Sequence, residues 1–230
     1  MDVSVLDIWG RNLSFREVER ILASGGYDIY GITALSTQFN YVEKLSSAIR
    51  NIDTSPIVVG GALAIFSYAE VLTAMEVDAC VLGEGEETVL DLFQAISSGT
   101  DLSRIRGIAY RADGETVLTE PREAAVDLDS IPLPAYDLFD METYTSNCCV
   151  YSKYARYDHL PAINVLTGRG CPFNCHFCSK TIQGVRYRSI DSVVDEIRML
   201  VDRYGIRGVF FNDEMVVGSK RRVYLSLIHI

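Results

Sequence analysis

The stretch Arg169-Gly-Cys-Pro-Phe-Asn-Cys-His-Phe-Cys178 holds three of the six cysteines of the chain. Spacings of four and three residues let three thiols of one loop converge on a small metal centre. Such bunching is typical of metal binding in a reducing compartment rather than of a disulfide framework. The stretch, called the cysteine loop below, follows an apolar run at residues 163–166 that has the composition of a β-strand. We therefore predict that the loop lies at the carboxyl end of a strand, where ligands bind in α/β folds.

The number of cysteines in the loop favours an iron–sulfur cluster. Four thiolates usually hold a four-iron four-sulfur cluster, so three leave one iron open to bind a substrate. A structural zinc ion would need a fourth ligand. His176 is poorly placed for it between two of the cysteines, although Cys148 or Cys149 could complete such a site. The predicted cluster ligands are Cys171, Cys175 and Cys178.

The first hundred residues alternate short apolar runs with helical patterns. Strands are expected over 3–7, 27–33, 56–60 and 77–82, and helices over 15–24, 41–52, 68–75 and 86–96. The first helix should begin at the capping box Ser14-Phe-Arg-Glu17. This alternation predicts a parallel sheet wrapped by helices. Two β-rich runs around Ala112-Asp-Gly114 predict a hairpin over residues 105–119.

A second α/β pattern starts at about residue 162, with strands over 163–166 and 208–211 and a helix over 191–204. We expect a first domain over 1–125, a linker over 126–160 and a second domain over 161–224. The last residues, Leu225-Ser-Leu-Ile-His-Ile230, resemble a translated sequencing adapter, so 225–230 is expected to be a non-native tail. The chain is then expected to be a fragment, with its second domain cut short.

Composition excludes some classes of function. The hydrophobic fraction of 48% argues against disorder, and 21 basic against 31 acidic residues give a net charge of −10. A negative field repels phosphate backbones, so we expect no nucleic-acid partner. No apolar run is long enough for a membrane span and no signal segment is visible. A cytoplasmic protein is expected.

The cysteine loop resembles the radical S-adenosylmethionine signature CxxxCxxC, with aromatic Phe177 before the last cysteine. The resemblance continues through Tyr187-Arg-Ser189, the helix with residues 193–197, and Val209-Phe-Phe-Asn-Asp-Glu214. It implies the beginning of a (β/α) barrel. In that family the open iron binds the amino and carboxylate groups of S-adenosylmethionine, and an electron from the cluster yields a 5′-deoxyadenosyl radical.

The same resemblance suggests contacts for S-adenosylmethionine. Phe177 would lie beside the adenine, and Asp213 and Glu214 would accept hydrogen bonds from the methionine ammonium. Because this stretch departs from the Gly-Gly-Glu form of the family, the choice between the two acids stays open.

The first domain resembles the cobalamin-binding fold that precedes the barrel in one large radical subfamily. The matching loops are Gly31-Ile-Thr-Ala-Leu-Ser-Thr37, Val59-Gly-Gly-Ala62 and Leu82-Gly-Glu-Gly-Glu-Glu-Thr88. The resemblance implies a Rossmann-like, flavodoxin-like α/β domain that lacks its first strand, so the chain is expected to be a fragment truncated at both ends. No histidine precedes His159, so the first domain lacks the histidine that serves as the lower cobalt ligand in some cobalamin families, either because the chain is truncated or because the subfamily never had it. The residues expected at cobalamin are Thr33, Leu35, Thr37, Gly60, Gly61, Gly83, Glu84 and Gly85.

Together these resemblances imply a cobalamin-binding radical S-adenosylmethionine enzyme. It would act on an unidentified small molecule by hydrogen abstraction, methyl transfer or ring cyclisation, with flavodoxin or ferredoxin as electron donor. The fragment itself is expected to be inactive. One alternative is a non-catalytic cobalamin- or zinc-binding module, which metal analysis would reveal. Another is a methylthiotransferase-like enzyme, which is disfavoured because only Cys80 precedes Cys148.

Overall fold

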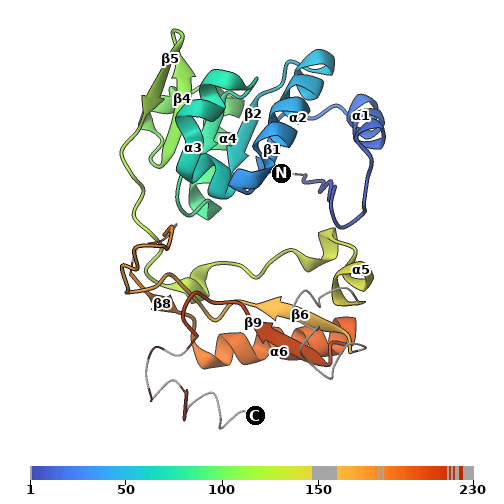
Figure 1. Cartoon of the computed structure of the whole chain (residues 1–230), viewed down its shortest axis with the longest axis vertical. Helices are drawn as coiled ribbons and strands as arrows, with labels where there is room; N and C mark the ends of the chain where they lie inside the picture. The colour runs from blue at the N-terminus through green and yellow to red at the C-terminus, as the bar shows by residue number, and fades with distance from the viewer. Residues whose placement is uncertain are drawn as a thin grey trace. The chain divides into compact units, whose positions relative to one another are not determined.

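The computed structural model describes residues 2–146, 160–180, 182, 184–216, 218, 220, 223 and 224. Cys148, Cys149 and the expected tail at 225–230 lie outside these residues. The chain divides into two compact units (Figure 1). One unit is Ser14–Ala125, and the other combines Met1–Leu13 with the chain from Val126 onward.

The first unit is built on a five-stranded sheet with the order β1-β2-β3-β4-β5. β1, β2 and β3 are parallel, and β4 and β5 add an antiparallel hairpin that turns through Asp113 and Gly114, both at positive φ. The prediction of a parallel sheet followed by a hairpin is therefore confirmed. The strands are β1 Tyr30–Thr33, β2 Ile57–Gly60, β3 Ala79–Val81, β4 Ile108–Ala112 and β5 Glu115–Leu118.

The helices of this unit begin and end at recognisable signals. The Ser14 backbone N–H donates to the Glu17 carboxylate at 2.8 Å, which completes the predicted capping box of α1. Gly99, in the left-handed conformation, ends α4. The helices are α1 Phe15–Ser24, α2 Phe39–Ile52, α3 Gly61–Ala74 and α4 Glu86–Ser98, with short 3₁₀ turns η1 Ser36–Gln38 and η2 Leu102–Arg104.

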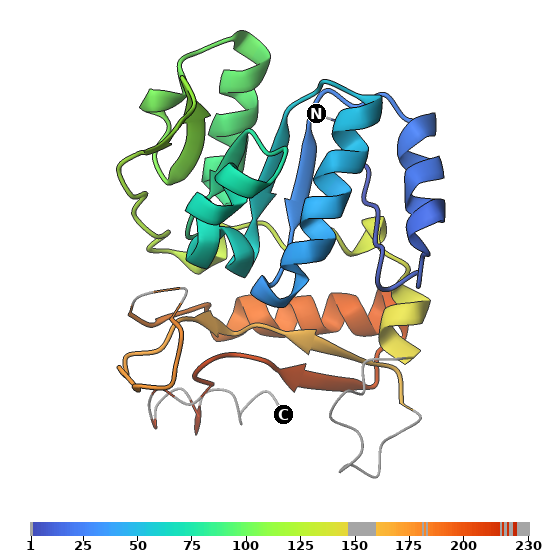
Figure 2. The same cartoon turned by 45° about the horizontal axis from the view of Figure 1, so that its top comes forward.

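Helix α3 begins at Gly61, directly after β2, and not near Tyr68 as predicted. Its backbone leaves the helical region at Ser67 (φ −143°), so two helical stretches meet at a kink there, and the predicted helix from Tyr68 corresponds to the second stretch. α2 and α3 lie side by side on one face of the sheet and α4 lies on the other (Figure 2). Leu92 of α4 is fully buried against Val58 of β2 and Ile108 of β4.

Residues 3–7 do not form the predicted strand and have no strand partner among the residues described. The Asp7 carboxylate instead accepts hydrogen bonds from the Gly10 N–H at 2.9 Å and the Tyr144 hydroxyl at 2.7 Å. Tyr144 belongs to α5, Met141–Ser146, in the same unit. This segment is thus joined to α5 by a side-chain hydrogen bond and, within the described part of the chain, not to a neighbouring strand.

The second unit contains the strand–helix–strand pattern predicted from the sequence. β6, Ala162–Val165, pairs in parallel with β9, Gly208–Phe211, and α6, Ile190–Tyr204, connects them and covers one face of the pair (Figure 2). Its core contains Val165 and Leu200 at 1% and 0% exposure. The remaining elements are β7 Gly168–Arg169, β8 Arg186–Tyr187, and the 3₁₀ turns η3 Leu128–Ser130 and η4 Tyr136–Leu138.

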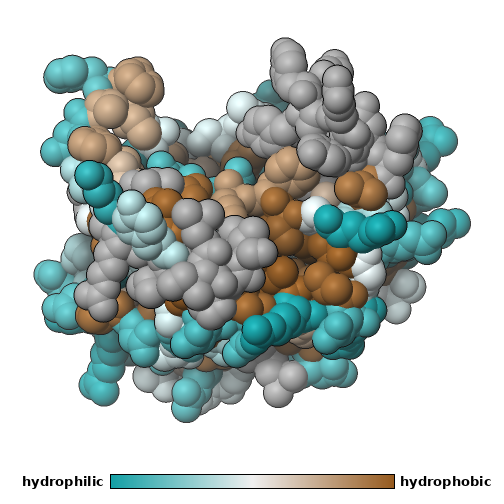
Figure 3. All heavy atoms as spheres, turned by 90° about the horizontal axis from the view of Figure 1, so that it is seen from below, coloured by the Kyte–Doolittle hydropathy of each residue, from teal (hydrophilic) through white to brown (hydrophobic). Residues whose placement is uncertain are grey.

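Apolar side chains remain exposed beside the β6–β9 pair. Leu166 and Phe211 are 49% and 44% exposed. A patch of apolar residues is visible on the face shown in Figure 3. Among the described helices, none combines the length and apolar character needed to cross a membrane.

Candidate functional site

Three loops of the first unit gather at one edge of its sheet. Residues 33–37 follow β1, residues 60 and 61 end β2 and begin α3, and residues 83–85 follow β3. Because the three strands are parallel neighbours, their carboxyl ends meet at the same edge, and Thr33 is directly opposite Gly60. The structure thus brings the residues expected at cobalamin to one edge.

The first two of these loops are in close backbone contact. Gly61 has φ +78°, and a Cβ atom there would lie 2.9 Å from the carbonyl oxygen of Ala34 and 2.9 Å from Thr33 Oγ1. The Leu63 N–H donates to the same Ala34 carbonyl at 3.0 Å. Glycine is therefore required at 61 both for its backbone conformation and for the space it leaves.

The other predicted residues of this edge differ in their surroundings. Leu35 is 61% exposed and Thr37 is also exposed, so neither side chain packs into the core. Gly83 has φ +77° with open space beside it. Glu84 accepts a hydrogen bond from the Ala125 N–H at 3.1 Å, which fixes this loop to the end of the unit. Gly85 is the residue before α4.

The cysteine loop of the second unit is closed at its base by backbone contacts. β7 and β8 pair across it, with Gly168 opposite Tyr187 and Arg169 opposite Arg186. Gly170 has φ +80°, and a Cβ atom there would lie 2.3 Å from the carbonyl oxygen of Gly184. Only glycine fits this approach without backbone movement.

Within the loop, the Cys178 N–H donates to the Cys175 carbonyl at 3.1 Å and forms a tight turn. Cys171 is half-buried, whereas Cys175 and Cys178 are exposed, and all three thiols are free. In the parts of the chain described, no three His, Cys, Asp or Glu side chains are close enough together to share a metal ion. The cluster ligand set therefore stays a prediction. Phe177 is 93% exposed.

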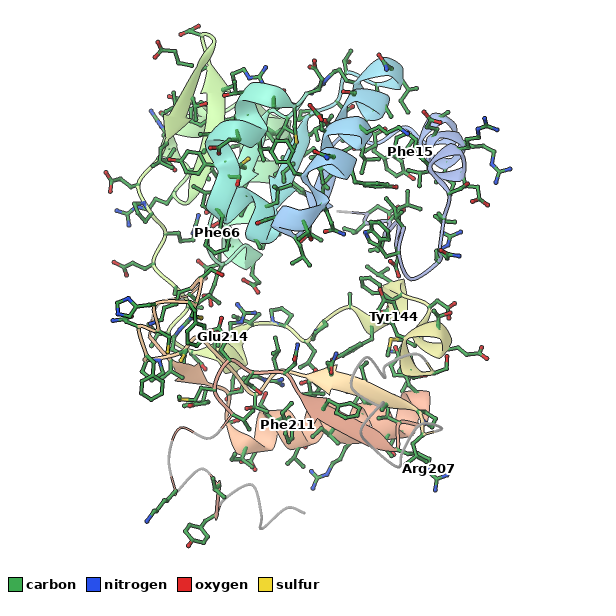
Figure 4. The ribbon with its side chains drawn as sticks, in the orientation of Figure 1. Phe15, Phe66, Tyr144, Arg207, Phe211 and Glu214 are labelled. Carbon is green, nitrogen blue, oxygen red and sulfur yellow. The ribbon has the colours of Figure 1, made fainter. Side chains whose placement is uncertain are left out.

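The two acids after β9 have different surroundings. Oδ1 of Asp213 accepts hydrogen bonds from the Thr167 N–H at 2.7 Å and from Thr167 Oγ1 at 3.1 Å. Oδ2 of Asp213 is buried and has no hydrogen-bond partner among the residues that the structure describes. Glu214 is exposed on the segment that follows β9 (Figure 4). Asp213 is thus fixed to the strand end that leads into the cysteine loop, with one carboxylate oxygen available.

A buried polar network beside the loop was not predicted from the sequence. Glu196 of α6, only 2% exposed, accepts hydrogen bonds from the Tyr136 hydroxyl and from Arg188. Burial, followed by the hydrogen bond to Glu196, raises the pKa of Tyr136 well above its usual value. One signal was present in the sequence: Glu196 lies at helical spacing between the buried residues Val193 and Leu200.

Sequence comparisons match both parts of the chain. Residues 1–93 match the B12 binding domain family. An uncharacterized methyltransferase of Pyrococcus horikoshii is 34% identical over 98% of this chain and 48% of its own length. The anaerobic magnesium-protoporphyrin IX monomethyl ester cyclase of Rubrivivax gelatinosus is 32% identical over 93% of this chain and 38% of its own length. The chain thus spans less than half the length of these relatives.

Solved structures share the fold. The radical S-adenosylmethionine methyltransferase TsrM of Kitasatospora setae, with cobalamin and a [4Fe-4S] cluster bound, superposes with a TM-score of 0.75 at 20% identity, covering 99% of this chain and 44% of that one. The cobalamin-dependent S-adenosylmethionine radical enzyme OxsB, with aqua-cobalamin and S-adenosylmethionine bound, gives a TM-score of 0.72 at 21% identity, covering 97% and 31%. The chain belongs to the family of radical S-adenosylmethionine proteins in which a B12-binding domain precedes the radical domain.

Proposed function

We propose that the protein is a radical S-adenosylmethionine enzyme that binds a four-iron four-sulfur cluster, S-adenosylmethionine and cobalamin. The observation that carries this proposal is the placement of the cysteine loop, which leaves the carboxyl end of β6 and lies beside Asp213, just after β9. Oδ1 of Asp213 is hydrogen-bonded to Thr167, and Oδ2 is buried without a hydrogen-bond partner among the described residues. When bound, the cluster supplies the electron that cleaves S-adenosylmethionine reductively.

The residues present fit these groups by their chemistry. Three free thiols in one loop, two of them exposed, form a suitable donor set for a cluster with one open iron. The unpartnered Oδ2 of Asp213 is an acceptor for a cationic group such as the methionine ammonium, and a carboxylate in a shielded site binds a cation strongly. Glu214, which is exposed, is the second candidate, and Phe177 would cover the adenine.

The edge formed by the three loops of the first unit is the proposed cobalamin site. Gly61 brings two loops into close contact, and exposed Leu35, Thr33 and Thr37 offer an apolar surface and two hydroxyls to a ligand. Gly83 leaves open space beside the third loop. The match of residues 1–93 to the B12 binding domain family supports this assignment and argues against a methylthiotransferase-like protein.

Methyl transfer to a small molecule is the reaction best supported by the relatives. Similar proteins include the methyltransferase of Pyrococcus horikoshii and the cytidylyl-2-hydroxyethylphosphonate methyltransferase of Streptomyces wedmorensis, 29% identical over 90% of this chain and 43% of its own length. Ring cyclisation is the second candidate, favoured by the 32% identity to the ester cyclase. A reduced flavodoxin or ferredoxin would deliver the electron, in a cytoplasm reducing enough to keep the thiols free.

Anaerobic reconstitution with iron and sulfide tests the proposal. We expect about four irons per chain, a broad visible absorption band, and an electron paramagnetic resonance signal after reduction that changes when S-adenosylmethionine is added. Aquacobalamin should bind in a separate titration. One zinc and no iron would favour the non-catalytic module instead and contradict the proposal.

A further inference from the structure

The two residues that lead from β6 into the cysteine loop are held by hydrogen bonds to other parts of the second unit. Thr167, 5% exposed, donates from its N–H and its hydroxyl to Asp213. Its carbonyl accepts a hydrogen bond from the Arg188 N–H at 2.9 Å. The carbonyl of Leu166 accepts one from Nη1 of Arg188 at 3.0 Å. Arg188 therefore contacts both residues at the point where the strand becomes the loop.

The guanidinium of Arg188 is in turn held in one orientation. Nη2 donates to the Ser192 carbonyl at 3.2 Å and to Ser192 Oγ at 3.0 Å, and Nη1 forms an ion pair with Glu196 Oε2. The side chains of Arg188 and Glu196 are only 12% and 2% exposed. A planar guanidinium satisfies such a fixed set of acceptors, which the single ammonium of lysine cannot do.

The segment before the second α/β pattern supplies the last members of this network. The Tyr136 hydroxyl donates to Oε1 of Glu196, so both oxygens of that buried carboxylate are engaged. Asp129 accepts the Ser189 N–H with both carboxylate oxygens at 3.0 Å, directly after Arg188. Burial alone would raise the pKa of Asp129, but the hydrogen bonds from Ser189 and Ser192 and the charge of Arg188 outweigh it, and the pKa is lowered.

We propose that Arg188 is a positioning residue for the cysteine loop, oriented by the buried carboxylate of Glu196 and the hydroxyl of Tyr136. This inference rests on the proposed function, because the loop is useful only if its thiols meet a cluster in a defined geometry. The network fixes the loop at its base, on residues 166 and 167, and leaves the exposed thiols of Cys175 and Cys178 to be ordered by the metal.

The test compares one buried and one exposed carboxylate on the same helix. Glu196→Gln keeps the shape of the side chain and an acceptor for Tyr136, but removes the charge that faces Arg188. Asp195→Asn makes the same chemical change in an exposed pair with Arg198, at side-chain exposures of 71% and 68%. Hydrogen exchange of the Thr167 and Arg188 amides is measured on the chain without metal. Release of iron to a chelator and the cluster resonance spectrum are measured after anaerobic reconstitution.

For Glu196→Gln we expect the two amides to exchange at least about tenfold faster and iron to be released at least about tenfold faster, because removing one partner of a buried pair is strongly destabilising. The lines of the cluster resonance spectrum should be broader than in the wild type after S-adenosylmethionine is added. Asp195→Asn should match the wild type, since exposed pairs contribute little. Arg188→Lys keeps the positive charge but not the planar guanidinium, so the amides of residues 167 and 188 should lose their protection from exchange in this variant as well.

The outcomes separate this inference from the proposed function. If the wild-type chain holds no iron, the proposed function fails, and the amide exchange still decides whether the network orders the loop. Unchanged amide exchange and iron release in Glu196→Gln, or equal effects in Asp195→Asn, would overturn the inference. If Glu196→Gln does not fold, Tyr136→Phe removes one hydrogen bond and keeps the ion pair. It should then raise both rates about threefold, and wild-type rates in that variant would also overturn the inference.

Discussion

Replacing Gly61 by alanine tests whether the contact between the first two loops of the sheet edge shapes a cobalamin site. An L-residue at φ +78° costs roughly 1–2 kcal/mol in the left-handed region. The added Cβ would also lie 2.9 Å from the Ala34 carbonyl, a backbone atom that must move. Overpacking of this kind typically costs about 1–3 kcal/mol more. We therefore expect Gly61→Ala to lower the free energy of unfolding by about 2–5 kcal/mol.

Gly99→Ala is the matched control. Gly99 has φ +67°, so the backbone cost is similar, but nothing lies within 4 Å of the added Cβ. This variant should lose only about 1–2 kcal/mol. Urea unfolding followed by circular dichroism measures both losses, and a titration with aquacobalamin followed by visible absorption measures affinity.

The two variants should differ most in ligand binding. Because Gly61→Ala displaces the Ala34 carbonyl next to Thr33 and Leu35, we expect its cobalamin affinity to fall at least about tenfold, or about 1.4 kcal/mol. Gly99→Ala should bind like the wild type. Equal affinities for Gly61→Ala and Gly99→Ala, in samples shown to be folded, would refute the assignment of this edge to cobalamin.

Three further predictions concern the cysteine loop and the sheet. Replacing any loop cysteine by alanine should abolish the cluster absorption, whereas Cys80→Ala should leave it unchanged, because that thiol is buried in β3 and burial raises its pKa to about 12. Gly170→Ala should reduce the iron content after reconstitution, because its Cβ would lie 2.3 Å from the Gly184 carbonyl oxygen. Gly205→Ala, also at positive φ but in open space, should keep the wild-type iron content. Equal iron contents in the two variants would contradict the expected role of Gly170. Burial, followed by the hydrogen bond to Asp53, raises the pKa of Tyr30 from 10.0 to about 12. The stability contributed by neutral Tyr30 should thus be fully present below about pH 10 and lost as the pH rises to about 12, and alkaline unfolding that is identical in Tyr30→Phe would argue against it.

The sequence alone predicted the elements whose signals are local. Apolar runs and turn residues located β1, β2 and β3 and the hairpin, and a capping box located the start of α1. The cysteine loop was identified by spacing within ten residues. The edge that gathers the three loops of the first unit follows from parallel strand order, which alternating strands and helices imply.

Tertiary structure decided the features that depend on partners distant in the chain. Residues 3–7 have the apolar pattern of a strand, but Asp7 bonds instead with Tyr144, 137 positions away. Asp213 is distinguished from Glu214 by its bonds to Thr167, 46 positions away. The buried carboxylate of Glu196 accepts a hydrogen bond from Tyr136, 60 positions away. Local periodicity carries no information about such partners, because it records which face of an element is apolar and not which side chain will meet it when the chain folds.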